Sequence, residues 1–265
     1  MAGDSILLER AGGVAVVTLN RPQAKNAIDA VATDRLTATF LSLQADEAVR
    51  AVVITGAGGD FCAGGDVKGM GEGGARSVAQ RRDDMARYRA LATSLLELDK
   101  PVIAAVDGVA FGAGLSLALL TDLVLASSRA RMAMVFHRIG LVPDVGAWYT
   151  LPRIVGLQRA KELIYSAREF GAAEAVGMGL ALEALPPDDL MPRAMAMARS
   201  FEGGSPVAFS LSKQALRASL QSDFSAMMDR EAASQAIAGD SDYFRESVRR
   251  FAAREPAQFQ WPKKD

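Results

Sequence analysis

Two glycine-rich stretches of the sequence could hold a reacting oxygen atom. "FCAGGD" spans residues 61–66, "GVAFGAG" spans residues 108–114, and both lie where a strand-like run gives way to a loop or helix. Glycine and alanine let a ligand approach the backbone closely, and the first turn of a helix leaves N–H groups without partners. Two such N–H groups that converge on one oxygen form an oxyanion hole, in which each donor contributes roughly 3 to 4 kcal/mol in a transition state.

Neither stretch matches a nucleotide-phosphate motif. Gly108, Gly112 and Gly114 do not have the G-x-G-x-x-G spacing of dinucleotide-binding loops, and the sequence has no G-x-x-x-x-G-K-[ST] phosphate loop. Because many glycine-rich loops only make turns, neither stretch assigns a function by itself.

Alternating strand-like and helix-like segments must position these stretches. Strand-like runs occupy residues 6–10, 14–20, 50–56, 100–108 and 122–128. Apolar residues recur at helical spacing in residues 30–43 and 114–120, and a polar segment that ends near Glu97 is also helix-like. A glycine-rich loop covers residues 57–77. This alternation predicts a layered α/β architecture.

The pattern becomes mainly helical from about Leu157. Helical spacing recurs in residues 159–167, 172–179, 189–203, 205–220 and 240–255. We therefore expect an α/β core over residues 1–195 that carries the site, followed by a helical C-terminal region over residues 196–265.

Composition excludes several classes of protein. With 30 basic and 31 acidic residues, the chain of 265 residues is nearly neutral, which argues against broad binding of nucleic acid. Cys62 is the single cysteine, so no intrachain disulfide can form, as suits a reducing cytoplasm. The start "MAGDSILLER" does not resemble a signal peptide, and the apolar stretch over residues 107–122 is too short and glycine-rich to span a membrane. We expect a cytoplasmic protein with no nucleic-acid or membrane partner.

Four motifs, taken in order and at their distances, resemble the crotonase superfamily of enoyl-CoA hydratases and isomerases. They are "NRPQAKNAI" (20–28), "FCAGGDVKGM" (61–70), "KPVIAAVDGVAFGAG" (100–114) and "IGLVPDVGAWYTLPRIVG" (139–156). The resemblance extends to "DYFRESVRRFAAREPAQF" (242–259), which looks like the family's C-terminal helix. It implies a crotonase-like α/β spiral of β-β-α units with a helical trimerisation region, and a homotrimer or dimer of trimers. It also implies an acyl-CoA substrate, so that CoA is part of the substrate and no separate cofactor or metal is expected.

The motif match implies particular backbone and side-chain roles. The N–H groups of Gly65 and Ala113 would hold the thioester oxygen, which carries the charge of an enolate. Groups expected near the CoA nucleotide are the side chain of Lys25 and main-chain groups around Ala63 and Asp66, and Lys68 could approach a phosphate. Solvated surface charges are the alternative interpretation of the two lysines.

The sequence departs from the family's hydratases at both of their glutamates. The motif match puts Ser116 at one of these positions and Phe136 at the other. Neither side chain can act as a carboxylate base, which argues against hydration by two glutamates.

Asp144 is the one carboxylate in a catalytic-looking place. Its motif "GLVPDVGAW" resembles epoxyphenylacetyl-CoA isomerase-like members, and chlorobenzoyl-CoA dehalogenases carry a nucleophilic aspartate at this position. One base suffices for a 1,3-proton shift, and a wall formed by Phe136, Val142 and Trp148 would raise the aspartate pKa from its usual value near 4. The alternative is that Asp144 caps a helix that begins at about Val145.

Other reactive or flexible side chains have simpler interpretations. We interpret Cys62 as packing and His137 as a polar residue near a pocket or a subunit contact. The methionines at 191, 195 and 197 are expected in the core, whereas Met70 and the loop through Gly74 are candidates for the acyl-chain wall.

The leading hypothesis is an enoyl-CoA isomerase in which Asp144 shuttles a proton while Gly65 and Ala113 stabilise the enolate. A hydratase, or a hydrolase or dehalogenase-like enzyme in which Asp144 attacks the acyl group, is the alternative among enzymes. A non-catalytic acyl-CoA-binding protein is the alternative from another class.

Overall fold

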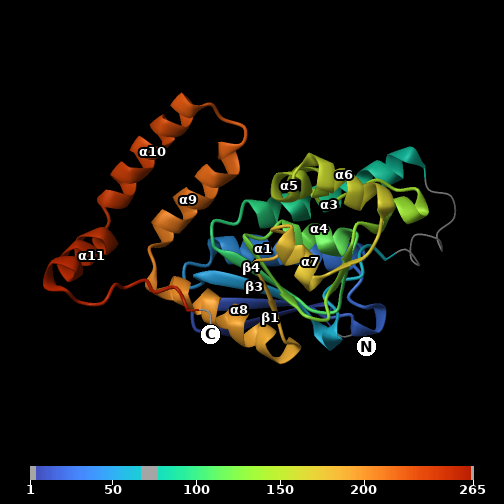
Figure 1. The fold of residues 1–265 in the computed structure, drawn as a ribbon, viewed down its shortest axis with the longest axis horizontal. Helices are drawn as coiled ribbons and strands as arrows, with labels where there is room; N and C mark the ends of the chain where they lie inside the picture. The colour runs from blue at the N-terminus through green and yellow to red at the C-terminus, as the bar shows by residue number, and fades with distance from the viewer. Residues whose placement is uncertain (1–3, 67–76, 264–265) are drawn as a thin grey trace.

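A parallel sheet with one antiparallel edge strand organises the protein. The computed structural model describes residues 4–66 and 77–263. Within them, the main sheet has the order β1-β2-β3-β4-β6-β9; β1 pairs with β2 antiparallel and every later pair is parallel. Its strands are Ile6–Ala11 (β1), Val14–Leu19 (β2), Ala51–Gly56 (β3), Val102–Val106 (β4), Leu123–Ser127 (β6) and Glu183–Leu185 (β9). Strands β2, β3, β4 and β6 are apolar and largely buried because helices cover both faces of the sheet (Figure 1), whereas the edge strand β1 exposes Leu8, Glu9 and Arg10.

A smaller sheet, in the order β5-β7-β8, lies beyond the ends of these strands. Its members are Val109–Phe111 (β5), Arg131–Ala133 (β7) and Phe170–Gly171 (β8). A strand of the main sheet is followed by a short strand of the second sheet and then by a helix, as in β4-β5-α4. The chain therefore winds in β-β-α turns, and the expected strand over residues 100–108 ends earlier than predicted.

The corner between β4 and β5 requires a glycine. Gly108 has a φ of +52°, and a Cβ there would lie 2.2 Å from the carbonyl oxygen of Gly59. The Asp107 carboxylate accepts hydrogen bonds from the Gly108 N–H, the Ser127 hydroxyl and the Arg129 guanidinium. The acidic side chain beside the second glycine-rich stretch thus holds the corner.

Helices cover both faces of the main sheet (Figure 1). On one face, α8 buries Leu190, Ala194 and Met197 against Val53 and Ile103. Of the three methionines expected in the core, Met197 is confirmed as buried, whereas Met191 and Met195 are partly buried and pack against the same cluster. The other face is covered by α1, α3 and α4. The helices are Ala30–Ala45 (α1), Val78–Leu96 (α3), Ala113–Leu119 (α4), Ala147–Val155 (α5), Leu157–Ser166 (α6), Ala172–Gly177 (α7), Pro187–Ser200 (α8), Pro206–Ser219 (α9), Phe224–Gly239 (α10) and Asp242–Ala253 (α11).

Helix α3 is held by a cap at its start and by a buried stripe along its length. Ser77 and Gln80 form a capping box at its start. Tyr88, Leu91 and Leu95 then form a buried stripe at helical spacing, and α3 packs on α1. This packing matters because Tyr88 faces the candidate site.

The C-terminal helices α9, α10 and α11 form an arm that stands away from the body (Figure 1). None of the described residues in these three helices is buried. Three large apolar side chains on the arm, Leu216, Phe224 and Phe251, are 72%, 81% and 86% exposed. The chain then returns to the body, where Phe259 and Trp261 pack on Phe201.

Most of the strands and helices expected from the sequence are confirmed. The helix α10 lies between two expected helical segments and was not predicted. The helix expected from about Val145 begins at Ala147. The division into residues 1–195 and 196–265 stays a prediction; α8 runs through that position. In the described part of the chain, none of the helices has the length and apolar character of a membrane span.

Candidate active site

The two glycine-rich stretches run side by side in the structure. The Cys62 N–H donates to the Val109 carbonyl at 2.8 Å, and the Phe111 N–H donates to the Cys62 carbonyl at 2.9 Å. A Cβ on Gly114 would lie 2.2 Å from the Cys62 oxygen, and a Cβ on Gly64 would lie 2.8 Å from the Phe111 oxygen. The glycines are therefore required by the contact between the two backbones.

This contact brings the Gly65 and Ala113 backbones together. Ala113 is the first residue of α4, so its N–H has no partner within the helix. The backbone on either side of Gly65 is bonded to Ile28. The Ile28 N–H donates to the Gly64 carbonyl at 2.8 Å, and the Asp66 N–H donates to the Ile28 carbonyl at 3.0 Å. In the ranges that the structure describes, neither the Gly65 nor the Ala113 N–H has a backbone acceptor. These two groups can donate to a ligand oxygen.

Asp144 lines a cavity of about 540 Å³. The cavity wall includes Ile28, Thr33, Met85, Tyr88, Leu141 and Asp144. Burial of the Asp144 carboxyl raises its pKa from 3.8 to about 6, because the charged form loses solvation. Its Oδ1 atom is buried and has no hydrogen-bond partner among the described residues. A carboxyl with this pKa can both take and return a proton near neutral pH.

The alternative role of Asp144 as a helix cap is wrong. Gly146 is the N-cap of α5, and no side chain caps this helix. The Ala147 N–H donates at 3.0 Å to the backbone carbonyl of Asp144, which leaves the carboxyl free of the helix. Val145 has a φ of +49°, a strained conformation for a β-branched residue. Backbone strain thus lies directly beside the candidate base.

The wall around Asp144 differs from the expected one. Val142 and Trp148 are 57% and 61% exposed and do not line the cavity. Phe136 is buried, and its ring lies beside Gly112. The apolar surroundings instead come from α3 and from the residues before α1, which pack over the site from a distant part of the sequence.

The positions of the two hydratase glutamates are filled by other contacts. Ser116 is fully buried in α4, and its hydroxyl donates to the Gly112 carbonyl at 3.1 Å. The Phe136 ring also lies against Gly112. Both side chains therefore pack at the start of α4 and offer no carboxylate.

The residues expected near CoA lie on adjoining backbone segments. The Ala63 N–H donates to the Lys25 carbonyl at 2.9 Å, and the Lys25 side chain is 58% exposed with its Nζ 3.6 Å from Asp60. Asp66 lines the cavity and accepts from Arg21 at 2.9 Å. Lys68 lies outside the described residues, as do Met70 and Gly74.

Sequence reasoning missed an asparagine that builds this region. Asn26 is buried, and its side-chain amide donates to the carbonyls of Ala57 and Asp60 at 2.8 and 2.6 Å. The same side chain accepts from the Arg21 N–H at 2.9 Å. An asparagine inside a turn-rich motif was the available clue, since this side chain often replaces backbone hydrogen-bond partners.

The remaining reactive side chains are not at the cavity. Burial raises the pKa of the Cys62 thiol to about 12, so it stays protonated, and its interpretation as packing is confirmed. His137 is exposed, and its ring stacks on Tyr165 with centroids 6.0 Å apart. In the described ranges, no cluster of side chains is suited to hold a metal ion.

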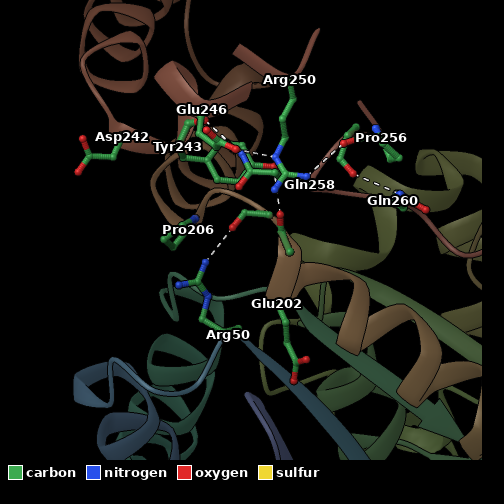
Figure 2. Close-up of a pocket in the computed structure, with 13 residues that line it drawn as sticks. Arg50, Glu202, Pro206, Asp242, Tyr243, Glu246, Arg250, Pro256, Gln258 and Gln260 are labelled. Carbon is green, nitrogen blue, oxygen red and sulfur yellow. Dashed lines mark hydrogen bonds and ion pairs between the residues drawn. The ribbon is translucent and has the colours of Figure 1, made fainter. Parts of the chain in front are cut away.

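A larger hollow, of about 720 Å³, lies between the body and the arm. Figure 2 shows Arg50 reaching from the body toward residues of α11. Its guanidinium donates to the Gly204 carbonyl at 2.8 Å, the Tyr243 hydroxyl donates to the Gly203 carbonyl at 3.1 Å, and Arg250 pairs with Glu246. These groups bind one another and join the arm to the body. Neither the glycine-rich motifs nor Asp144 lines this hollow. The cavity lined by Asp144 is therefore the candidate active site.

Comparison with known proteins agrees with this architecture. The chain belongs to the enoyl-CoA hydratase/isomerase family, whose model matches residues 9–263, and it is an acyl-CoA enzyme of that family. A solved enoyl-CoA hydratase/isomerase from Cupriavidus metallidurans CH34 is 38% identical, with full coverage of both chains and a TM-score of 0.94. The resemblance to crotonases and the expected fold class are therefore confirmed.

Two curated relatives carry different activity names. A "Probable enoyl-CoA hydratase" of Rhodobacter capsulatus is 38% identical over 98% of this chain and 99% of its own length. The 1,2-epoxyphenylacetyl-CoA isomerase of Escherichia coli K12 is 33% identical over 93% of this chain and 95% of its own length. Family membership thus leaves two kinds of chemistry to compare.

Proposed function

We propose that the protein shifts the double bond of an enoyl-CoA thioester by a one-base proton transfer. The observation that carries this proposal is the Asp144 carboxyl, buried beside the cavity with a pKa of about 6. As a carboxylate, it takes a proton from C2 of a 3-enoyl-CoA, and the electron pair spreads over C4 and the thioester oxygen. The acid form then returns the proton to C4, and the product is the 2-enoyl-CoA isomer.

The Gly65 and Ala113 N–H groups would hold the negatively charged oxygen of this intermediate. Their proximity and their lack of backbone acceptors among the described residues support this role. Preorganised donors favour the transition state because they need no reorientation when charge develops.

CoA would enter as part of the substrate, so the reaction needs no separate cofactor. Lys25, Lys68 and main-chain groups around Ala63 and Asp66 are proposed to bind the CoA portion. The exposed ammonium of Lys25 and the adjacent backbone of Ala63 support this arrangement.

A hydratase is the second candidate, supported by the names of relatives. Besides the Rhodobacter protein, a "Short-chain-enoyl-CoA hydratase" of Clostridium acetobutylicum is 37% identical over 83% of this chain. In a hydratase with Ser116 and Phe136 at the glutamate positions, Asp144 would have to activate water alone.

Incubation with 2-enoyl-CoA and 3-enoyl-CoA thioesters in deuterated water, followed by mass spectrometry and proton NMR, separates the candidates. Interconversion of the two isomers at constant composition, with deuterium uptake, is the expected result. A mass gain of one D₂O indicates hydration, and release of free CoA indicates hydrolysis. Turnover of none of these thioesters would contradict the proposed reaction.

We propose a homotrimer or dimer of trimers in the cytoplasm. The arm supports self-association because its helices expose large apolar side chains instead of burying them. The single buried cysteine is compatible with a reducing compartment. Sedimentation equilibrium tests the subunit number.

A further inference from the structure

The proposed proton transfer gives no role to the hydroxyl of Tyr88, one of the polar groups in the cavity wall. Tyr88 is 9% exposed and lines the same cavity as Asp144. The structure gives this hydroxyl no hydrogen bond to a described residue, and its oxygen is not among the fully enclosed atoms that lack a partner. A tyrosine hydroxyl of low exposure usually has a protein or water partner, so one at a cavity that no described group satisfies is open to a ligand oxygen.

The ring is held in place by the packing of α3. Leu91 and Leu95, one and two turns further along the helix, are fully buried. They belong to the same buried stripe as Tyr88, and the helix packs on α1. A group on a rigid helix is well placed for selecting a ligand because it does not have to be ordered on binding.

The surroundings make Tyr88 a hydrogen-bond donor. Burial, together with the charge of Asp144 and smaller effects of Cys62, Asp84 and Asp29, raises the pKa of its phenol to about 12. The hydroxyl therefore keeps its proton throughout the neutral range. Its preferred partner is an oxygen with a free lone pair.

The acyl group determines whether this donor is satisfied. Water can satisfy the hydroxyl while the cavity is unliganded. A purely hydrocarbon acyl chain that displaces the water leaves a buried donor unpaired, which is unfavourable. An acyl chain with an oxygen at this point restores the hydrogen bond.

We propose that Tyr88 is a specificity-determining residue that favours acyl-CoA thioesters with a hydroxyl, oxo or epoxide oxygen on the acyl chain, within reach of its phenolic hydroxyl. This inference rests on the proposed acyl-CoA site at the Asp144 cavity. It does not require that Asp144 is the base, because selection occurs in binding.

Isothermal titration calorimetry with three probes tests the inference: butanoyl-CoA, 3-hydroxybutanoyl-CoA and 4-hydroxybutanoyl-CoA. We expect the full-length wild-type protein to bind at least one hydroxylated thioester about tenfold more tightly than butanoyl-CoA, the effect of one hydrogen bond. Tyr88→Phe, which removes only the hydroxyl, should abolish this preference. The control Tyr165→Phe should keep it, because Tyr165 is 68% exposed and does not line the cavity. Mass spectrometry after each titration verifies that the probe is unchanged.

The outcomes distinguish this inference from the proposed function. If all three thioesters bind equally to the wild type, or if Tyr88→Phe keeps the preference, the inference is wrong while the acyl-CoA site stands. If none of them binds, the site itself is wrong and the inference fails with it. Tyr88→Met serves as a second apolar variant if Tyr88→Phe does not fold, with circular dichroism as the check.

Discussion

Cys62 and Gly114 are in direct backbone contact: a Cβ on Gly114 would lie 2.2 Å from the Cys62 carbonyl oxygen. The contact holds the two glycine-rich stretches together and so sets the separation of the Gly65 and Ala113 N–H groups. Since Cys62 is bridged to Ala110 and Gly114 lies in the first turn of the buried helix α4, neither backbone can yield easily.

Gly114→Ala is expected to lower the stability of the protein by about 1 to 3 kcal/mol, the usual cost of overpacking. Thermal unfolding measures this loss. The matched control is Gly177→Ala at the end of α7, where an added Cβ meets nothing within 4 Å. Equal melting temperatures for Gly114→Ala and the wild type would show that the contact is not rigid.

Asp144→Asn is expected to reduce turnover by about two to four orders of magnitude, because the amide cannot accept the substrate proton. Binding of CoA thioesters should persist. Steady-state kinetics and calorimetry measure the two properties. Asp83→Asn, on the exposed side of α3, is the control and should keep full activity. Full turnover by Asp144→Asn on every accepted substrate would disprove the assignment of the base.

The pH dependence of catalysis should follow the ionisation of Asp144. With a pKa of about 6, the carboxylate form increases as the pH rises through 6. We therefore expect kcat/KM to increase from pH 5 to 7 and then level off. A profile that is flat across this interval, or that falls, would exclude Asp144 as the group that must be ionised.

Stability should change with pH in the opposite direction. The folded protein holds the Asp144 proton up to about pH 6, whereas the unfolded chain releases it near 3.8. The folded state thus binds more protons between these values, and this group's contribution to stability falls as the pH rises through the interval. Asp144→Asn should gain stability over the wild type at pH 7.5 and less at pH 4. Denaturant titrations at both pH values measure the difference, and a constant difference would contradict the raised pKa.

Ala113→Pro is expected to lower kcat by roughly 100- to 1000-fold by removing one oxyanion donor. Proline suits the first position of a helix, where its missing N–H breaks no helical bond, so α4 should still form. Ala172→Pro makes the same change at the first residue of α7, away from the cavity, and should keep activity. Ligand titration and circular dichroism separate a lost donor from a lost fold. Unchanged turnover in Ala113→Pro would rule out this donor.

Charge on the exposed face of the arm should disrupt the proposed trimer. Phe224→Asp and Phe251→Asp place a carboxylate where apolar side chains are 81% and 86% exposed. Burying that charge in an interface is unfavourable, so smaller species are expected in analytical ultracentrifugation. A monomeric wild type would show that the arm does not mediate association.

Local sequence patterns were sufficient to predict several strands but not the contact between the glycine-rich stretches. Apolar runs bounded by turn residues located β1, β2 and β3. The small residues around Gly64 and Gly114 were interpreted as room for a ligand, whereas the structure shows that they also let the two backbones meet. The early end of β4 at Val106 and the separate strand β5 over Val109–Phe111 were missed, because they depend on a corner formed with Gly59 in a distant loop.

The cavity wall was beyond prediction from local patterns. Tyr88 lies in a polar stretch of α3, and its position beside Asp144 arises only when α3 packs over α1. Val142 and Trp148 are near Asp144 in sequence but are exposed, because the chain turns through the left-handed Val145 and Gly146. Sequence proximity was therefore a poor guide to the surroundings of the base.

The buried Oδ1 atom of Asp144 has a stereochemical consequence. Since Oδ1 is enclosed and has no partner among the described residues, only the second carboxylate oxygen can meet a substrate. The proton that leaves C2 and the proton that arrives at C4 must then pass through one oxygen on one side of the acyl plane. A double-bond shift at this site would be suprafacial: the proton leaves C2 and arrives at C4 on the same face. With a substrate that is chirally deuterated at C2, the isotope content and the configuration of the product would reveal that face.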